Sequence, residues 1–185
     1  MIALDRSFFA REATTVAPQL LNKVLRYGAC TGRIIEVEAY LQDDPASHSF
    51  RGRTPRNRAM FGAPGHLYVY LIYGMHHCAN VVTGAVDDGQ AVLIRAVTPR
   101  TGLDEMIARR GRTANLCGGP GVLCQAFGID RTHDGSDLCA EPASASLGIS
   151  IWDDGTPAPT RPTTSRRVGI RVGRDLPWRY RASPE

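Results

Sequence analysis

The spacing of apolar residues predicts a β-sheet in the first hundred residues of the chain. Side chains in a strand point alternately to opposite faces, so short alternating or apolar runs bounded by glycines predict strands and hairpins. One hairpin is expected to join residues 23–27 to 33–40, and a second to join residues 67–73 to 76–83. A continuous apolar run at 91–97 predicts another strand, and the set indicates a mixed sheet.

Helical spacing and turn signals place short helices around this sheet. A proline in a first turn and a Gly-Gly-Pro start mark two of them. Predicted helices lie at 7–11, 16–21, 102–110 and 121–127, later strands at 166–172 and 178–181, and a surface loop at 153–165. Because the length suits one hydrophobic core, we expect a single α+β domain over residues 1–185. Its sheet should be curved, mixed and mostly antiparallel, with flanking short helices and one protruding β-hairpin.

A carboxylate and an aromatic ring share one face of the strand at 33–40. Glu36, Glu38 and Tyr40 project from that face. The opposite face should carry Ile35, Val37 and Ala39. Arg95 lies within an apolar strand, where a guanidinium needs an anionic partner, and Glu38 is the natural candidate. Such a pair would hold a carboxylate where a general base can activate water; the alternatives are a structural salt bridge or an arginine that faces solvent.

Aromatic side chains of the two hairpins are spaced to form a stacking surface. Tyr68 and Tyr70 share one face of their strand, whereas Tyr73 takes the opposite face just before a glycine. With Tyr40 and His48 they could stack a nucleobase, at about 1–3 kcal/mol for each ring. Tyr73, at a hairpin tip, could enter a duplex in place of a displaced nucleotide. For any one of these residues, a structural place in the sheet is the simpler interpretation.

Arginine supplies almost all of the positive charge. The chain has 22 Lys and Arg against 18 Asp and Glu, a formal net charge of +4, and Lys23 is its only lysine. The arginines cluster at 51–58, 109–112 and 166–181. A guanidinium suits bidentate phosphate contacts, so the clusters indicate a polyanionic partner, although each alone could be a solvated loop.

Other kinds of site are not favoured. The five cysteines form no C-x-x-C pair, and His76 and His77 would point to opposite faces of a strand, so we expect no disulfide framework, metal or cofactor. No G-x-S-x-G elbow or phosphate-binding glycine loop occurs. The apolar runs are too short to cross a bilayer and no signal peptide is evident, which predicts a cytoplasmic protein.

These residues together make the chain similar to one known family. Over nearly its whole length it resembles the alkyladenine (3-methyladenine) DNA glycosylase family, and it looks like a bacterial member. The most specific blocks of the resemblance are residues 36–40, 46–48, 53–61, 64–75 and 93–96. The protruding hairpin is then expected to meet double-stranded DNA that contains damaged purines.

The resemblance implies hydrolysis of the N-glycosidic bond of a damaged purine, which leaves an abasic site. Glu38 would activate the attacking water, with Arg95 and the backbone carbonyl of Val168 also holding it. A nearby carboxylate would stabilise a transition state with oxocarbenium character. Lys23 lies in the first predicted hairpin, away from the pocket blocks, so we expect no Schiff-base chemistry and a monofunctional enzyme.

The resemblance also implies how the substrate is held. Tyr40, His48 and Tyr70 would line the pocket that stacks the flipped purine, and Asn80 would sit where the exocyclic amino group of guanine clashes. Tyr73 would fill the hole in the duplex from the minor groove. Further DNA contacts are expected from Met75, Arg51, Arg53, Arg56 and Arg58.

Two positions depart from the family pattern, and two other functions stay open. His76 replaces a frequent aromatic, and Val122 replaces a frequent lysine; each change could weaken the grip on DNA or alter the range of lesions. A damage binder without hydrolysis would not need both Glu38 and Arg95, and a hydrolase of free nucleosides would not need a wedge. Residue types do not choose among alkylated, deaminated and etheno purines, and we expect a monomer.

Overall fold

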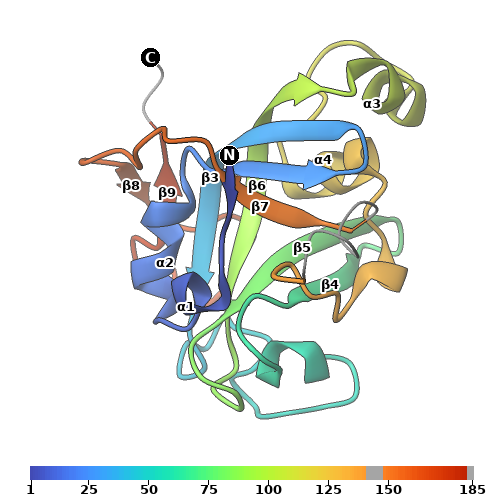
Figure 1. Ribbon diagram of the computed structural model, residues 1–185. Coiled ribbons are helices and arrows are strands. Elements are labelled where there is room, and N and C mark those ends of the chain that lie inside the picture. Colours follow the sequence, from blue (N-terminus) through green and yellow to red (C-terminus); the bar gives the residue numbers. More distant parts are fainter. Residues whose placement is uncertain (141–147, 183–185) are drawn as a thin grey trace.

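The computed structural model describes residues 1–140 and 148–182, and its main feature is one curled β-sheet (Figure 1). The main path of the sheet runs in the order β1-β7-β2-β3-β6-β5-β4; β9 pairs with β3, and β8 pairs with β9. The strands are β1 (Ile2–Ala3), β2 (Val24–Tyr27), β3 (Cys30–Tyr40), β4 (Leu67–Ile72), β5 (His76–Thr83), β6 (Gln90–Thr101), β7 (Ser150–Asp153), β8 (Thr163–Ser165) and β9 (Arg179–Arg181). Every strand pair among the described residues is antiparallel. The predicted α+β fold is therefore confirmed, but the sheet is antiparallel rather than mixed over these residues.

Short helices cover the sheet from two sides. They are α1 (Arg6–Phe9), α2 (Ala13–Leu20), α3 (Leu103–Arg110) and α4 (Pro120–Phe127), with 3-10 turns at Arg58–Phe61 and Arg131–His133. In Figure 1, α1 and α2 lie in front of β3 at the lower left, and α3 and α4 lie together at the upper right. The buried residues of α2 are Ala13, Val16, Ala17 and Leu20, which is helical spacing for one face. No helix of the described residues is long and apolar enough to cross a membrane.

A bulge in β3 decides which of its side chains enter the core. The register shifts between Ile34, which pairs with Val97, and Val37, which pairs with Ile94. Ile34 and Val37 are therefore both fully buried, although strict alternation would send them to opposite faces. Strict alternation, which predicted one face for Ile35 and Val37, does not describe their burial across the bulge, because Val37 is buried and Ile35 only partly so.

The C-terminal third of the chain departs most from the predicted elements. Residues 166–172 form an irregular loop instead of the predicted strand, and Gly169 within it has φ of +80°, which a strand does not allow. The predicted loop at 153–165 contains β8, and β7 was missed, although it pairs with both β1 and β2. These strands have three or four residues, too few for an alternation pattern to show.

Candidate active site

A cavity of about 490 Å³ opens between the β4–β5 hairpin, the ends of β3 and β6, and the loop at 166–172. Many of the residues expected at the site line it, although they come from four separate segments of the chain. Those residues are Tyr40, His48, Tyr70, Tyr73, Asn80, Arg95 and Val168. Glu38 lies directly behind this lining, with no exposed surface. The structure therefore brings the predicted residues of the two hairpins and of β6 to one place.

The carboxylate of Glu38 is held by donors from two cavity walls. Its Oε1 accepts a hydrogen bond from the backbone N–H of Val168 at 2.8 Å, and its Oε2 accepts one from the Tyr40 hydroxyl at 2.9 Å. Nη1 of Arg95 lies 3.3 Å from Oε1. A fully buried carboxylate is costly unless hydrogen bonds and an opposite charge compensate it, and here both are present. Val168 meets Glu38 through its N–H, whereas the expected contact of its carbonyl with a water stays a prediction.

Arg95 is shared between two carboxylates, and the closer one is Glu36. Its Nε donates to Oε1 of Glu36 at 2.6 Å, and Arg179 donates to the same oxygen at 2.8 Å. Burial opposes the charge of Arg95, but Glu38 and Glu36 outweigh it and raise the pKa of the guanidinium. The predicted pairing of Arg95 with Glu38 is thus present, but as the longer of two contacts, and sequence reasoning missed the roles of Glu36 and Arg179.

Aromatic rings form the opposite wall of the cavity. The ring centroids of His48 and Tyr70 lie 4.5 Å apart, and those of Tyr68 and Tyr70 lie 5.5 Å apart. Burial, helped by Glu38, raises the pKa of the Tyr40 hydroxyl well above its usual range, and burial raises that of Tyr68 to about 12. Both hydroxyls therefore keep their protons at neutral pH. The wall offers flat ring surfaces together with fixed hydroxyl donors.

His48 is held in place by the Tyr68 hydroxyl, 2.9 Å from its Nδ1. Burial, followed by the nearby charge of Arg56, lowers the pKa of the imidazole, so the ring is neutral at pH 7. Asn80 is also buried, and its amide nitrogen donates to the backbone carbonyl of Tyr68 at 3.0 Å. Tyr68 therefore orients two of the predicted substrate-binding residues.

The tip of the β4–β5 hairpin carries an exposed tyrosine in a strained backbone conformation. Tyr73 has φ of +54° and Gly74 has φ of +70°, both in the left-handed region. Tyr73 is 79% exposed and Met75 is 72% exposed, which is unusual for large apolar side chains. Tyr73 lies just beyond β4, which ends at Ile72, so the turn, rather than strand alternation, sets its direction. A left-handed tyrosine with a solvent-exposed ring points to a functional constraint at this position.

The arginine loop at 51–58 is built around a buried asparagine. The side-chain oxygen of Asn57 accepts from the Thr54 N–H at 2.6 Å, and its amide nitrogen donates to the carbonyls of His48 and Gly52 at 2.8 and 3.0 Å. The loop is thereby tied to the cavity wall that His48 forms.

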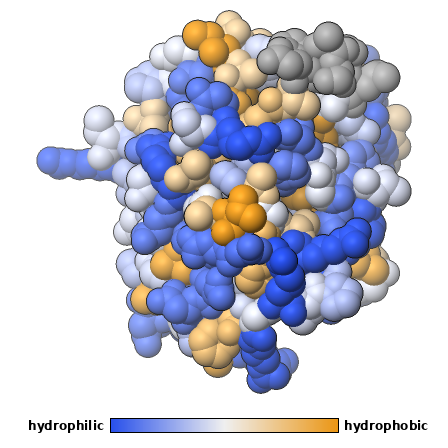
Figure 2. Space-filling view, turned by 60° about the horizontal axis from the view of Figure 1, so that its bottom comes forward, coloured by the Kyte–Doolittle hydropathy of each residue, from blue (hydrophilic) through white to orange (hydrophobic). Residues whose placement is uncertain are grey.

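Figure 2 shows how strongly hydrophilic residues dominate the face that lies at the bottom of Figure 1, with hydrophobic residues in small separate groups.

The four arginines of this loop are not equivalent. Arg53 donates to Asp87 at 2.5 Å and to the carbonyl of Phe61 at 2.9 Å, and Arg56 donates to the carbonyl of Leu71 at 3.3 Å. Within the described part of the chain, the side chains of Arg51 and Arg58 are exposed and make no ion pair. Arg53 therefore stabilises the loop itself, and Arg51 and Arg58 are the charges best placed to meet a polyanion.

Two buried charges beside the cavity were missed by sequence reasoning. Asp44 and Arg167 form an ion pair whose side chains have no exposed surface. Arg167 lies in an arginine cluster that the sequence indicated as a surface for a polyanion, and no local pattern distinguishes it from exposed Arg166. Among residues 1–140 and 148–182, no group of three or more His, Cys, Asp or Glu side chains could hold a metal ion.

An aromatic cavity lies over a buried carboxylate, with a basic loop and an exposed tyrosine at its rim, and this arrangement is typical of enzymes that act on nucleobases. A family model described as methylpurine-DNA glycosylase (MPG) matches residues 7–185. A relative from Burkholderia lata is 53% identical over 182 residues, covering 96% of this chain and 86% of its own length. Relatives from Agrobacterium fabrum and Methanoculleus marisnigri are 48% and 45% identical; they cover 96% and 97% of this chain and 87% and 94% of their own lengths. Each of the three carries 3-methyladenine DNA glycosylase as its provisional name.

The chain belongs to the methylpurine-DNA glycosylase family. The resemblance expected from the sequence is therefore confirmed, and the protein is a DNA glycosylase of this family.

Proposed function

We propose that the protein is a monofunctional DNA glycosylase of base excision repair. It takes a damaged purine of the 3-methyladenine, hypoxanthine or ethenoadenine class out of double-stranded DNA and hydrolyses its N-glycosidic bond. The observation that carries this proposal is the buried carboxylate of Glu38, held by Val168 and Tyr40 at the edge of an aromatic cavity. The enzyme acts as a single-domain monomer over residues 1–185, in the cytoplasm and at the nucleoid.

The proposed reaction is the attack of one water on C1′ of the flipped nucleotide. Glu38 accepts a proton from the water, the oxygen bonds to C1′, and the electron pair of the broken N-glycosidic bond leaves with the purine. The carboxylate also faces the positive charge that develops on the sugar. Arg95 and the carbonyl of Val168 would help to hold the water. The products are the free base and an abasic site.

The cavity walls support recognition by stacking. Tyr40, His48 and Tyr70 would hold the flipped purine by their ring faces, and a cationic alkylated base gains further from the ring quadrupole. Asn80 is buried at the wall, where it would exclude the amino group of guanine. Tyr73 and Met75, exposed at the hairpin tip, would fill the space that the flipped nucleotide leaves.

One assay separates this function from its two competitors. A duplex containing hypoxanthine or 1,N6-ethenoadenine is incubated with the protein and then treated with hot alkali. We expect strand breaks only after the alkali, and release of the free base. Binding without breaks on any lesion would support a damage binder, and release of base from free inosine but not from duplex would support a nucleoside hydrolase.

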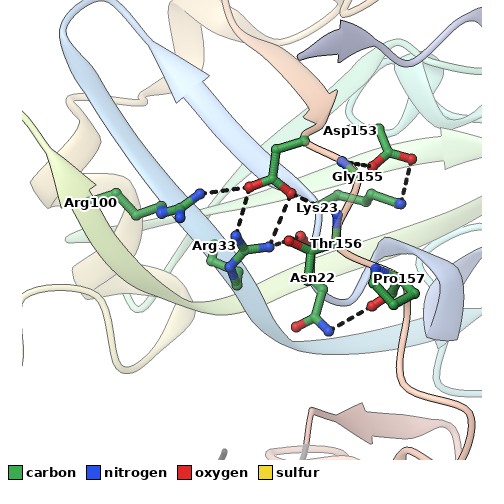
Figure 3. A network of polar contacts seen from close by, with 9 residues as sticks. Asn22, Lys23, Arg33, Arg100, Asp153, Gly155, Thr156 and Pro157 are labelled. Carbon is green, nitrogen blue, oxygen red and sulfur yellow. Dashed lines mark hydrogen bonds and ion pairs between the residues drawn. The ribbon is translucent and has the colours of Figure 1, made fainter.

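Absence of strand-cleaving lyase activity is a second expected result. Lys23, the only lysine, does not line the cavity, and its Nζ is 2.7 Å from Asp153. Figure 3 shows this contact within a network that also contains Arg33 and Arg100. We expect no covalent adduct when borohydride is added during turnover, and no loss of excision in Lys23→Gln. An adduct that disappears in Lys23→Gln would contradict the monofunctional assignment.

The arginine loop yields a graded prediction for DNA binding. Arg51→Gln and Arg58→Gln should each reduce the slope of log K against log salt for undamaged duplex by about 1, because each removes one phosphate contact. Arg161→Gln, an exposed arginine outside the three arginine clusters that does not line the cavity, is the matched control and should leave the slope unchanged. Arg53→Gln should instead lower thermal stability, because Arg53 holds Asp87 and Phe61. Unchanged slopes in both loop variants would remove this loop from the DNA interface.

A further inference from the structure

A fully buried ion pair joins three walls of the cavity. Arg167 donates to both carboxylate oxygens of Asp44, at 3.0 Å from its Nη2 to Oδ1 and through Nη1 to Oδ2. Neither side chain has exposed surface. Neither residue is part of the cavity lining, so the pair acts on the site only through the residues that it contacts.

Arg167 reaches the first wall, which is the end of β3. Its Nη1 donates to the carbonyl of Ala39 at 3.0 Å, and its guanidinium carbon lies 4.6 Å from the ring centroid of Tyr40. The same guanidinium carbon lies 5.2 Å from the centroid of Trp178. A guanidinium that stacks on two aromatic rings restricts the position of both. The Tyr40 ring is thereby held where its hydroxyl meets Glu38.

The same pair also holds the second and third walls. Nη2 of Arg167 donates to the carbonyl of Gly173 at 3.3 Å, which closes the loop that carries Val168. Oδ1 of Asp44 accepts from the N–H of Ala46 at 3.0 Å, in the turn that leads to His48. The loop approaches so closely that a Cβ at Gly173 would lie 2.9 Å from Oδ1 of Asp44.

Stability alone does not account for these two charges. A buried ion pair pays a large desolvation penalty, and well-packed hydrophobic residues of similar volume are often equally stable. What hydrophobic residues cannot reproduce is the set of directed contacts to Asp44, Ala39 and Gly173, together with the stacking on Tyr40. The pair is therefore better explained by placement than by stability.

We propose that Asp44 and Arg167 are positioning residues for the hydrolytic step, an inference that rests on the proposed function of Glu38. They hold the Val168 N–H and the Tyr40 hydroxyl on the two oxygens of that carboxylate. Without them both donors shift, and the carboxylate loses the hydrogen bonds that fix its direction. The base is then aimed less well at the water.

The test measures single-turnover excision with saturating enzyme on the hypoxanthine duplex, and separately the affinity for undamaged duplex. Asp44→Asn keeps the shape of the side chain but weakens the pair, and the double variant Asp44→Leu/Arg167→Met removes both charges. We expect both to lose about 10- to 100-fold in rate, the effect of weakening a hydrogen bond to a charged group. Affinity for undamaged duplex should stay unchanged, so that the loss lies in the rate at saturating enzyme and not in DNA binding.

A matched control replaces an ion pair whose residues do not line the cavity. Asp154 pairs with Arg33 at 2.7 Å, and Asp154→Asn should leave both the rate and the affinity for undamaged duplex as in the wild type. A double variant that folds and keeps the wild-type rate would overturn the proposal. Failure of both variants to fold would also overturn it, because the fold would then need the pair. Wild-type protein that is inactive on every lesion would instead refute the proposed function.

Discussion

Glu38→Gln is expected to abolish base excision while leaving the fold intact. The amide oxygen of glutamine can still accept the hydrogen bond from Val168, so the local structure is retained. It cannot accept a proton from water or balance positive charge on the sugar, and loss of a general base costs about 10²- to 10⁴-fold in rate. The measurement is single-turnover release of hypoxanthine, with thermal unfolding to confirm folding.

The neighbouring carboxylate supplies the control for this variant. Glu36 also contacts Arg95, but the Val168 N–H and the Tyr40 hydroxyl donate to Glu38 and not to Glu36. Glu36→Gln keeps a hydrogen-bonding side chain toward Arg95 and Arg179, and Glu38 keeps its own donors, so this variant should lose clearly less rate than Glu38→Gln. If Glu38→Gln keeps its activity, or if Glu36→Gln loses as much, the assignment of the base is wrong.

Tyr73→Gly is expected to make the protein more stable and less active. Relief of a left-handed tyrosine, at φ of +54°, should raise the free energy of unfolding by about 1 kcal/mol. Loss of the ring removes the group proposed to fill the gap in the duplex. Because base–aromatic stacking contributes about 1–3 kcal/mol, excision from duplex at limiting enzyme should fall by about 5- to 150-fold. Excision from single-stranded DNA, where no gap forms, should change little.

Leu71→Ala is the matched control for the wedge, since Leu71 is an exposed apolar residue of the same hairpin. It should change neither the stability nor the ratio of duplex to single-strand excision appreciably. An equal loss on both substrates in Tyr73→Gly would indicate damage to the cavity, not loss of a wedge.

The central hairpins and the strand that contains Arg95 were predictable, because alternation and glycine turns are local signals. The sequence predicted 67–73 with 76–83, and the structure has Leu67–Ile72 with His76–Thr83. The errors arose where contacts between distant parts of the chain override a pattern that is read from neighbouring residues. Strict alternation failed at Ile35, where β3 contains a bulge, and the predicted strand at 166–172 failed where the chain must close over a buried ion pair.

By itself the sequence determined the chemistry that is present: a carboxylate and tyrosines at strand spacing, one lysine, and clustered arginines. These follow from residue type and short periodicity, which need no knowledge of distant contacts. Only the tertiary structure decided which of them meet. It placed the Val168 N–H on Glu38, gave Arg95 a second carboxylate in Glu36, and separated buried Arg167 from its exposed neighbour. Burial and pairing depend on segments far apart in the chain, so no local pattern could have assigned them.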